Sequence, residues 1–172
     1  MKQFSDRCKE LLIKSEKLAM DSNNLYVYPE HLALNIFSNP SYFIRKILDE
    51  FKLDNVSIIS SIEENISKLP IIKSKINEIK IHHETNKVLN HAINLANENG
   101  DELVAEDYLL LALVAEKNNL TNILKSKEIN KEKLKIFIDK FRRGKKAMTN
   151  TAENNFDSLN RYAVDVTQKA PQ

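Results

Sequence analysis

Apolar residues recur along most of the chain at intervals of three and four, which is the spacing of an α-helix with one buried face. They predict eight helical segments, within residues 4–19, 29–37, 44–51, 58–69, 88–96, 109–114, 120–124 and 134–141. Pro29 suits the first position of its helix, and Pro70 stops the fourth segment because proline disfavours helical geometry in its predecessor. Gly100 and Gly144 follow the fifth and eighth segments, where a left-handed residue commonly closes a helix. The pattern predicts an all-α fold.

The second half of this pattern repeats the first. An offset of 77 positions places Leu11-Leu12 against Val88-Leu89, and one position less places Ile47-Leu48 against Ile123-Leu124. Each copy carries four helical segments. We therefore expect two four-helix repeats that pack as one pseudo-twofold domain with a groove between them.

The repeats also suggest where the domain ends. The predicted body covers residues 1–144, divided into repeat one (1–69), a connector (70–81) and repeat two (82–144). Residues 145–155 are polar and lack apolar periodicity, which is typical of a flexible linker. Residues 156–172 resume helical spacing, but so short a stripe has nothing of its own to pack against. We expect these last residues to be the truncated start of a further domain.

Glycine usage excludes two kinds of nucleotide site. The chain has 2 glycines, so neither a GxxxxGK[ST] phosphate loop nor a GxGxxG dinucleotide turn can be written in it. The carboxylates are scattered along polar faces without a recognisable acid and base pair. No cofactor is expected within these residues, and the chain is not expected to be an enzyme by itself.

The charge of the chain is concentrated at one place. Its formal net charge is +2, yet five basic residues fall within residues 140–146, while residues 1–139 carry slightly more acidic than basic side chains. A nucleic-acid-binding domain needs a basic face on its folded body. We therefore expect no nucleic-acid partner, and we interpret the basic stretch as complementing a helix end and solubilising the linker.

Cys8 is the single cysteine, so no internal disulfide can form and a reducing compartment is the simplest setting. Its apolar neighbours predict a buried small side chain rather than a nucleophile. The N-terminus lacks the apolar core of a signal peptide, and the longest apolar run, residues 108–115, is too short to span a bilayer. The expected location is the cytoplasm, with no membrane partner.

The histidines give no metal pattern. His83 and His91 lie about two helical turns apart, whereas metal-binding pairs on a helix usually lie four residues apart, and position 87 is a lysine. No metal site is therefore expected. His31 lies just inside a predicted helix start and is expected to be a packed or hydrogen-bonded structural residue.

Three segments carry a resemblance to a known family. They are the helix start Pro29-Glu30-His31-Leu32-Ala33-Leu34, the segment Gly100-Asp101-Glu102-Leu103-Val104 and the tail from Leu159 to Ala170. Together with the doubled four-helix body, they resemble the N-terminal region of the ClpB family of AAA+ protein disaggregases. The body alone fits any Clp N domain, whereas the tail resembles the ClpB linker and the entry to its first ATPase module.

The resemblance implies a mobile substrate-receiving domain tethered above a hexameric ATPase ring. Such a domain contacts unfolded or aggregated polypeptide and hands it to the ring without hydrolysing ATP itself. ATP and Mg²⁺ would be bound by the remainder of the homohexameric ClpB parent, and an Hsp70-type chaperone system would be its partner. The chain would end before the nucleotide-binding loop.

The resemblance also implies substrate-binding positions. The polar ones are Ser5, usually threonine in the family, Asp101, and Asp107, often glutamate. The apolar patch falls on His91, Leu95 and Tyr108, where His91 and Tyr108 replace aliphatic residues and make the patch more polar. From the residues alone, Asp101 and Asp107 also suit helix capping or the helix dipole, and Leu95 also suits the core.

Two other functions stay open. The first is the adaptor- or substrate-docking N domain of a Clp protease unfoldase, similar to ClpA or ClpC. The tail argues against it. The second is a freestanding helical regulator that binds a small molecule or nucleic acid, but the chain lacks a basic face and a helix-turn-helix signature.

Overall fold

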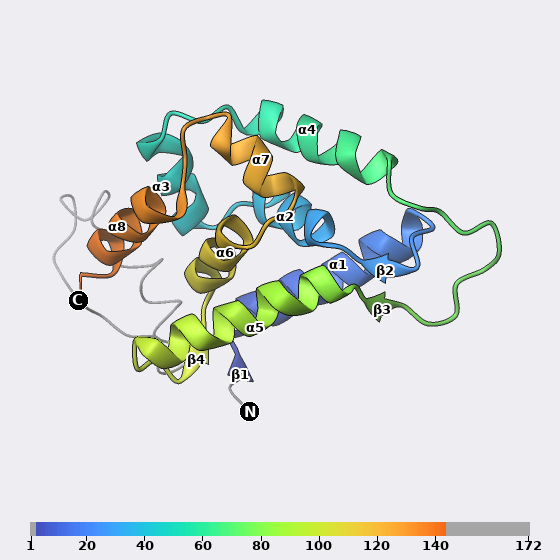
Figure 1. Cartoon of the computed structure of the whole chain (residues 1–172), viewed down its shortest axis with the longest axis horizontal. Coiled ribbons are helices and arrows are strands. Elements are labelled where there is room, and N and C mark those ends of the chain that lie inside the picture. The colour runs from blue at the N-terminus through green and yellow to red at the C-terminus, as the bar shows by residue number, and fades with distance from the viewer. Residues whose placement is uncertain (1–2, 144–172) are drawn as a thin grey trace, which may run out of the picture.

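The computed structural model describes residues 3–143, which form eight α-helices and four two-residue strands (Figure 1). The elements are β1 (Gln3–Phe4), α1 (Asp6–Asp21), β2 (Tyr26–Val27), α2 (Pro29–Ser38), α3 (Tyr42–Glu50), α4 (Asn55–Ser67), β3 (Lys80–Ile81), α5 (His83–Glu98), β4 (Leu103–Val104), α6 (Glu106–Ala115), α7 (Asn119–Lys125) and α8 (Lys131–Arg142). The predicted fold class, two repeats of four helices each, is confirmed. The predicted linker and the segment 156–172 lie outside the described residues.

The two repeats match in their backbone as well as in their sequence. Helices α1 and α5 have 16 residues each, and α2 and α6 have 10 each. The turn after α1 is closed by Asn23 at φ 58°, and the turn after α5 by Gly100 at φ 73°. A second equivalent pair, Lys52 and Glu128, also has positive φ. The predicted pseudo-twofold relation therefore also holds for the backbone conformation of individual turn residues.

Short strands exchanged between the repeats join the two halves. β1 pairs with β4 and β2 pairs with β3, both in parallel. β1 directly precedes α1 and β4 directly follows α5, so the start of α1 lies near the end of α5. The pairing of β2 with β3 places the end of α1 near the start of α5 in the same way. The two long helices are therefore antiparallel neighbours, and the pseudo-twofold axis runs between them.

The centre of the core is α6. All its residues from Glu106 to Val114 are buried. It lies against α5, α7, α8 and α1, so it has no face left for water (Figure 1). This enclosure explains why its sequence is one continuous apolar run rather than a stripe.

Two local features differ from the sequence prediction. The apolar spacing did not indicate the four strands, because two-residue strands are too short to show an alternating pattern. The left-handed residue that ends α8 is Arg143, with φ 52°, whereas Gly144, the residue expected to close this helix, lies outside the described residues. The Arg143 N–H bonds to the carbonyl of Asp139, which ends the helix one residue earlier than expected.

Substitution of Gly100 by alanine is expected to destabilise the domain. A left-handed φ of 73° costs nothing for glycine but is strained for a residue with a Cβ. The expected loss is about 1 kcal/mol in the free energy of unfolding, measured by urea denaturation. Asn97→Ala, at an exposed position in the last turn of α5, is the control and should lose less than about 0.5 kcal/mol. Equal losses in the two variants would contradict the assignment of strain to Gly100.

Candidate functional site

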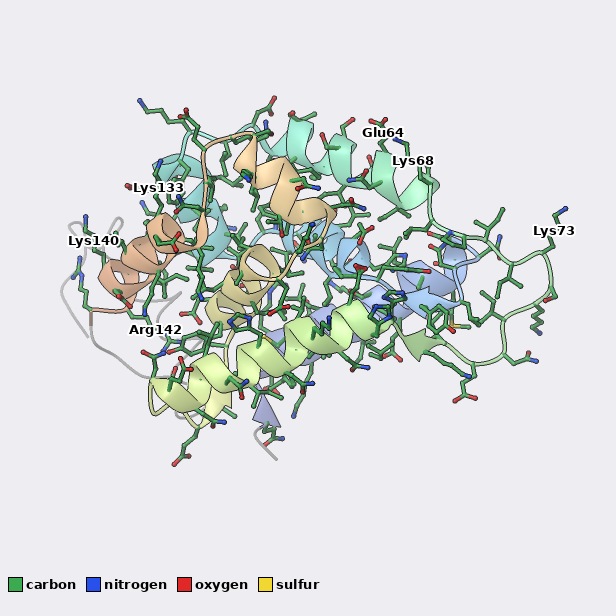
Figure 2. The ribbon with its side chains drawn as sticks, in the orientation of Figure 1. Glu64, Lys68, Lys73, Lys133, Lys140 and Arg142 are labelled. Carbon is green, nitrogen blue, oxygen red and sulfur yellow. The ribbon has the colours of Figure 1, made fainter. Side chains whose placement is uncertain are left out.

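Three of the predicted site residues meet at a buried arginine. Arg142 lies at the end of α8, on the side turned toward the α5–β4 turn (Figure 2). Its Nε and Nη2 donate to the two carboxylate oxygens of Asp107, the latter over 2.9 Å, and Nη1 donates to Asp101 over 2.5 Å. The Tyr108 ring lies under the guanidinium, 4.6 Å from its carbon to the ring centre, and Tyr108 also hydrogen-bonds Asp101. We call Asp101, Asp107, Tyr108 and Arg142 the Arg142 cluster.

Local sequence places each member of the Arg142 cluster. Asp101 follows the left-handed Gly100, and its N–H bonds to the carbonyl of Ala96, which turns the chain back toward α5. Asp107 is in the first turn of α6, where its Oδ1 accepts from the Tyr108 N–H over 2.8 Å. A carboxylate is stabilised at a helix N-terminus by the helix dipole. Asp107 therefore stabilises the start of α6, as its position in the sequence suggested, in addition to binding Arg142.

Burial and charge act in opposite directions in the Arg142 cluster. Each of the four side chains is at most 7% exposed. Burial disfavours the charged arginine, but Asp107, Tyr108 and Asp101 outweigh it and hold the pKa of Arg142 above its usual value. Burial also raises the pKa of the Tyr108 hydroxyl. The cluster is therefore a charged clamp between α8 and the α5–α6 turn.

Of the other three predicted site residues, Ser5 precedes α1, and His91 and Leu95 lie on α5. Ser5 is fully buried and caps α1, accepting from the Cys8 N–H over 3.2 Å. Leu95 is 7% exposed and belongs to the core. His91 is half-buried on α5, and its Nδ1 lies 2.7 Å from a carboxylate oxygen of Glu116 at the end of α6. Of the six predicted residues, His91 is the one with substantial exposure.

Arg142 was missed as a site residue. The sequence assigned it, with its basic neighbours, to a solvated stretch, and Lys140 and Arg143 are indeed exposed. Arg142 is instead 5% exposed because it continues the buried face of α8 formed by Leu134 and Ile138. Four-residue spacing from those two positions was the available signal.

Repeat one has neutral side chains at two of the positions equivalent to the Arg142 cluster. Asn24 stands where Asp101 stands in repeat two, and His31 stands where Tyr108 does. His31 Nδ1 accepts from the Tyr28 N–H over 2.9 Å, so Nε2 carries the proton and donates to Asn24 Oδ1 over 2.9 Å. Asn24 Nδ2 in turn donates to the carbonyl of Pro70. Burial lowers the pKa of His31 to about 4, which keeps it neutral, and the predicted structural role of His31 is confirmed.

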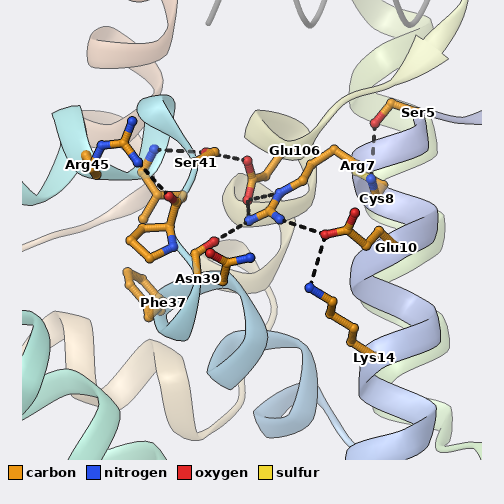
Figure 3. Close-up of polar contacts among 12 residues, drawn as sticks. Ser5, Arg7, Cys8, Glu10, Lys14, Phe37, Asn39, Ser41, Arg45 and Glu106 are labelled. Atoms are coloured by element: carbon orange, nitrogen blue, oxygen red, sulfur yellow. Dashed lines mark hydrogen bonds and ion pairs between the residues drawn. The ribbon is translucent and has the colours of Figure 1, made fainter.

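A second polar network ties repeat one to the start of α6 (Figure 3). The Arg7 guanidinium contacts Glu106 at 3.3 Å, donates to the Asn39 carbonyl over 2.8 Å and reaches Glu10 at 3.3 Å. Ser41 Oγ donates to the other carboxylate oxygen of Glu106 over 2.7 Å. These contacts hold α1 and the α2–α3 turn against the first turn of α6. They therefore fix the relative positions of the two repeats.

Half-buried apolar side chains line the α1 and α5 pair. Leu12 of α1 and Leu89 and Ile93 of α5 are partly exposed and pack against the core. Leu12 and Leu89 occupy equivalent positions. The pseudo-twofold relation exchanges α1 and α5, so each of the two long helices carries a half-buried leucine at the same place in its sequence. We call Leu12, Leu89 and Ile93 the α1–α5 surface.

Within residues 3–143, no group of three or more His, Cys, Asp or Glu side chains is placed to hold a metal ion. In that range, too, every helix is too short or too polar to cross a membrane. Cys8 is buried, as the sequence predicted.

Comparison with known proteins gives a consistent result. Residues 3–127 match the Clp repeat (R) N-terminal domain. The chaperone ClpB of Rickettsia conorii is 28% identical over 170 residues, 98% of this chain and 20% of that protein. ClpB of Bacteroides thetaiotaomicron is 24% identical over 167 residues, 97% of this chain and 19% of that protein. The chain thus spans about a fifth of the length of these chaperones.

Solved structures share the fold. The Hsp104 N-terminal domain from Candida albicans has a TM-score of 0.78 at 18% identity, covering 88% of this chain and 99% of that one. The ClpV N-domain from Vibrio cholerae has a TM-score of 0.66 at 17% identity, covering 80% and 83%. The sequence resemblance to ClpB is confirmed by these matches together. Because the family match also covers most of its length, the chain belongs to the Clp repeat (R) N-terminal domain family.

Proposed function

We propose that this chain is the polypeptide-receiving N-terminal domain of a ClpB-type AAA+ disaggregase. It contacts unfolded or aggregated protein and passes it to a hexameric ATPase ring formed by the rest of the parent protein. The ring, its ATP and Mg²⁺, cooperation with an Hsp70-type chaperone and a cytoplasmic location are all part of this proposal. The observation that carries it is the match of 98% of the chain to ClpB chaperones that are about five times longer.

Two further observations support a binding role for this domain. One solved relative is described as a complex of a ClpV N-domain with a VipB peptide, at a TM-score of 0.62, so the fold accepts a peptide in that protein. The 2 glycines of this chain leave it without either glycine-rich nucleotide loop. The protease-unfoldase alternative has weaker support, because the N-terminal domain of ClpD from Arabidopsis thaliana matches at a TM-score of 0.56, against 0.78 for Hsp104.

We infer that the α1–α5 surface is the place of contact. Unfolded polypeptides expose apolar side chains, and a shallow apolar surface binds them weakly enough to release them. Leu12, Leu89 and Ile93 supply such a surface, and His91 of α5 is accessible for polar contact.

The five buried residues of the predicted site act through the positions of these helices. Ser5 fixes the start of α1, and Leu95 packs α5 onto the core. Asp101, Asp107 and Tyr108 bind Arg142 and so hold the end of α5 against α6 and α8. Replacing any of the five is therefore expected to report on folding as well as on binding.

Removing the apolar side chains of α5 should weaken client binding. The double variant Leu89→Gln, Ile93→Gln keeps helix-forming residues but exposes amides instead of two half-buried apolar groups. The expected loss of affinity for a reduced, unfolded test protein is about tenfold, since each side chain contributes roughly half of a full burial energy. Fluorescence anisotropy of the labelled test protein measures it.

The matched control is Val56→Gln on α4, which removes an apolar side chain that is 76% exposed and lies outside the α1–α5 surface. Circular dichroism should show an unchanged helix content in both variants. If the double variant folds and binds like the control, the α1–α5 surface does not receive clients. If the parent chain binds a peptidase adaptor and no unfolded protein, the disaggregase assignment itself fails.

A further inference from the structure

A separate hollow lies between α3 and α8, away from the α1–α5 surface. Its volume is about 390 Å³, within the usual range of ligand sites. Its lining comes from the second half of α3 and the adjoining Phe51, and from one face of α8 and the adjoining Arg143. The lining residues are Lys46, Glu50, Phe51, Lys133, Ile136, Phe137, Lys140, Phe141 and Arg143. We call this hollow the α3–α8 groove.

The wall of the α3–α8 groove is aromatic. Phe51, Phe137 and Phe141 are all partly exposed, and the centres of neighbouring rings lie 6.1 Å apart. Phe43 packs behind them, 5.2 Å from Phe141 in an edge-to-face contact. Ile136, which is 59% exposed, extends the apolar area toward solvent. Large rigid rings with open faces are the groups that most often anchor a partner.

The rim of the α3–α8 groove is basic. Four of its lining residues carry a positive charge, and Glu50 is the one lining carboxylate. Lys133 and Lys140 lie two turns apart on α8, on opposite sides of Ile136 and Phe137 along the helix (Figure 2). Lys133 also donates to the Glu128 carbonyl, and Lys46 lies 5.8 Å from the centre of the Tyr42 ring. An occupant with carboxylates beside an apolar side chain matches this rim.

The groove is not a consequence of the internal symmetry. Its pseudo-twofold counterpart is the pair α4 and α7, whose backbones are in close contact, whereas α3 and α8 approach each other mainly through side chains. On α8, Phe137 and Phe141 stand where α4 has Ser61 and Asn65. The aromatic residues are thus confined to this one of the two equivalent places.

We propose that the α3–α8 groove docks an acidic polypeptide segment that presents a bulky apolar residue between Asp or Glu side chains. The apolar residue fills the space against Phe51 and Phe137. Its acidic neighbours face Lys133 and Lys140. This site is independent of the α1–α5 surface, so a partner or a client segment can be held here while a second segment is bound on the other helices.

The test uses the full chain and a short fluorescent peptide of alternating glutamate and leucine. Binding is measured by anisotropy at low and high salt. Lys133→Glu combined with Lys140→Glu is expected to weaken binding by at least about tenfold, and binding by the parent chain is expected to fall as salt screens the rim. Ile136→Asp should weaken binding as well, since it places a carboxylate in the apolar part of the groove.

Lys135→Glu is the matched control, because Lys135 is exposed on the same helix but does not line the groove. It should keep at least half of the parent affinity. Leu89→Gln, Ile93→Gln should also keep it, which separates this proposal from the proposed function.

Several results would overturn the proposal. One is an unchanged affinity in the double lysine variant with an intact fold. Another is equal binding of a peptide in which glutamine replaces glutamate. If a single-stranded oligonucleotide displaces the peptide and binds with higher affinity than the peptide does, the groove is a nucleic-acid site instead. Sedimentation that shows a dimer lost in Ile136→Asp would assign it to a second copy of the chain.

Discussion

Arg142→Met is expected to cost about 3–5 kcal/mol in the free energy of unfolding, the largest effect of any single substitution considered for this domain. The substitution keeps an unbranched side chain of similar length but removes the charge that Asp101 and Asp107 face in a site closed to water. Leaving a buried carboxylate without its partner costs more than the ion pair itself contributes. Urea denaturation followed by circular dichroism measures the loss.

Three further variants separate charge from packing at this position. Arg142→Lys keeps the charge but cannot bind both oxygens of Asp107, so an intermediate loss is expected. Asp107→Asn in the Arg142→Met background removes one of the stranded charges, and the double variant should lose less than the sum of the two single variants. Arg143→Met, at the exposed neighbour, should change stability by less than about 0.5 kcal/mol. A loss for Arg142→Met as small as that control would show that the Arg142 cluster does not clamp α8.

Arg142 also explains what the sequence could and could not predict about the site. On α8, the buried face is Leu134, Ile138 and Arg142, and the equivalent face of α4 is Ile58, Ile62 and Ile66. Spacing marks position 142 as inward-facing, while its charge suggests solvent. The conflict is resolved only by two carboxylates that are 41 and 35 residues away in the chain. Periodicity does not report such a contact, because it depends on how distant segments fold together.

The fold was more predictable than the site because the signal is repeated. Each helix has a counterpart, and a pattern seen twice is less ambiguous than one seen once. Leu53 and Ile129 illustrate this: each follows a left-handed residue, and each N–H bonds back to a leucine carbonyl, Leu48 in one repeat and Leu124 in the other. The strands were not predictable in this way, because the pairing of β1 with β4 joins residues from opposite repeats.

The sequence did not reveal that most of the predicted contact residues are buried. The family resemblance implied that Asp101, Asp107 and Tyr108 touch clients, but their side chains are used inside the domain. A sequence motif identifies residues that a family needs, and it does not separate residues that touch a ligand from residues that position a surface. The proposed α1–α5 surface depends on which apolar side chains of α1 and α5 stay partly exposed, and the sequence alone does not give that exposure.

His31 should make the stability of the domain depend on pH between about 4 and 6.5. Its side chain is fully buried, and both ring nitrogens are used by the neutral form: Nδ1 accepts from the Tyr28 N–H and Nε2 donates to Asn24. Protonation of Nδ1 would break the first of these bonds and place a charge in the core. Burial therefore lowers the pKa of His31 from 6.5 to about 4 in the folded state.

The sign of the pH effect follows from the lowered pKa. Below pH 6.5 the unfolded chain takes up a proton at His31 that the folded chain does not bind until about pH 4. The stability that the neutral ring contributes is thus complete above pH 6.5 and is lost as pH falls toward 4, by at most about 3 kcal/mol.

His31→Gln can still accept from the Tyr28 N–H, as glutamine does at this position of a capping box, but it does not titrate. The difference in unfolding free energy between the parent and His31→Gln should therefore shift in favour of the variant on acidification, measured by urea denaturation at a series of pH values. A difference that is constant from pH 7 to about pH 4 would mean that His31 binds its proton equally in both states, and the buried Tyr28–His31–Asn24 chain would then not hold the ring neutral.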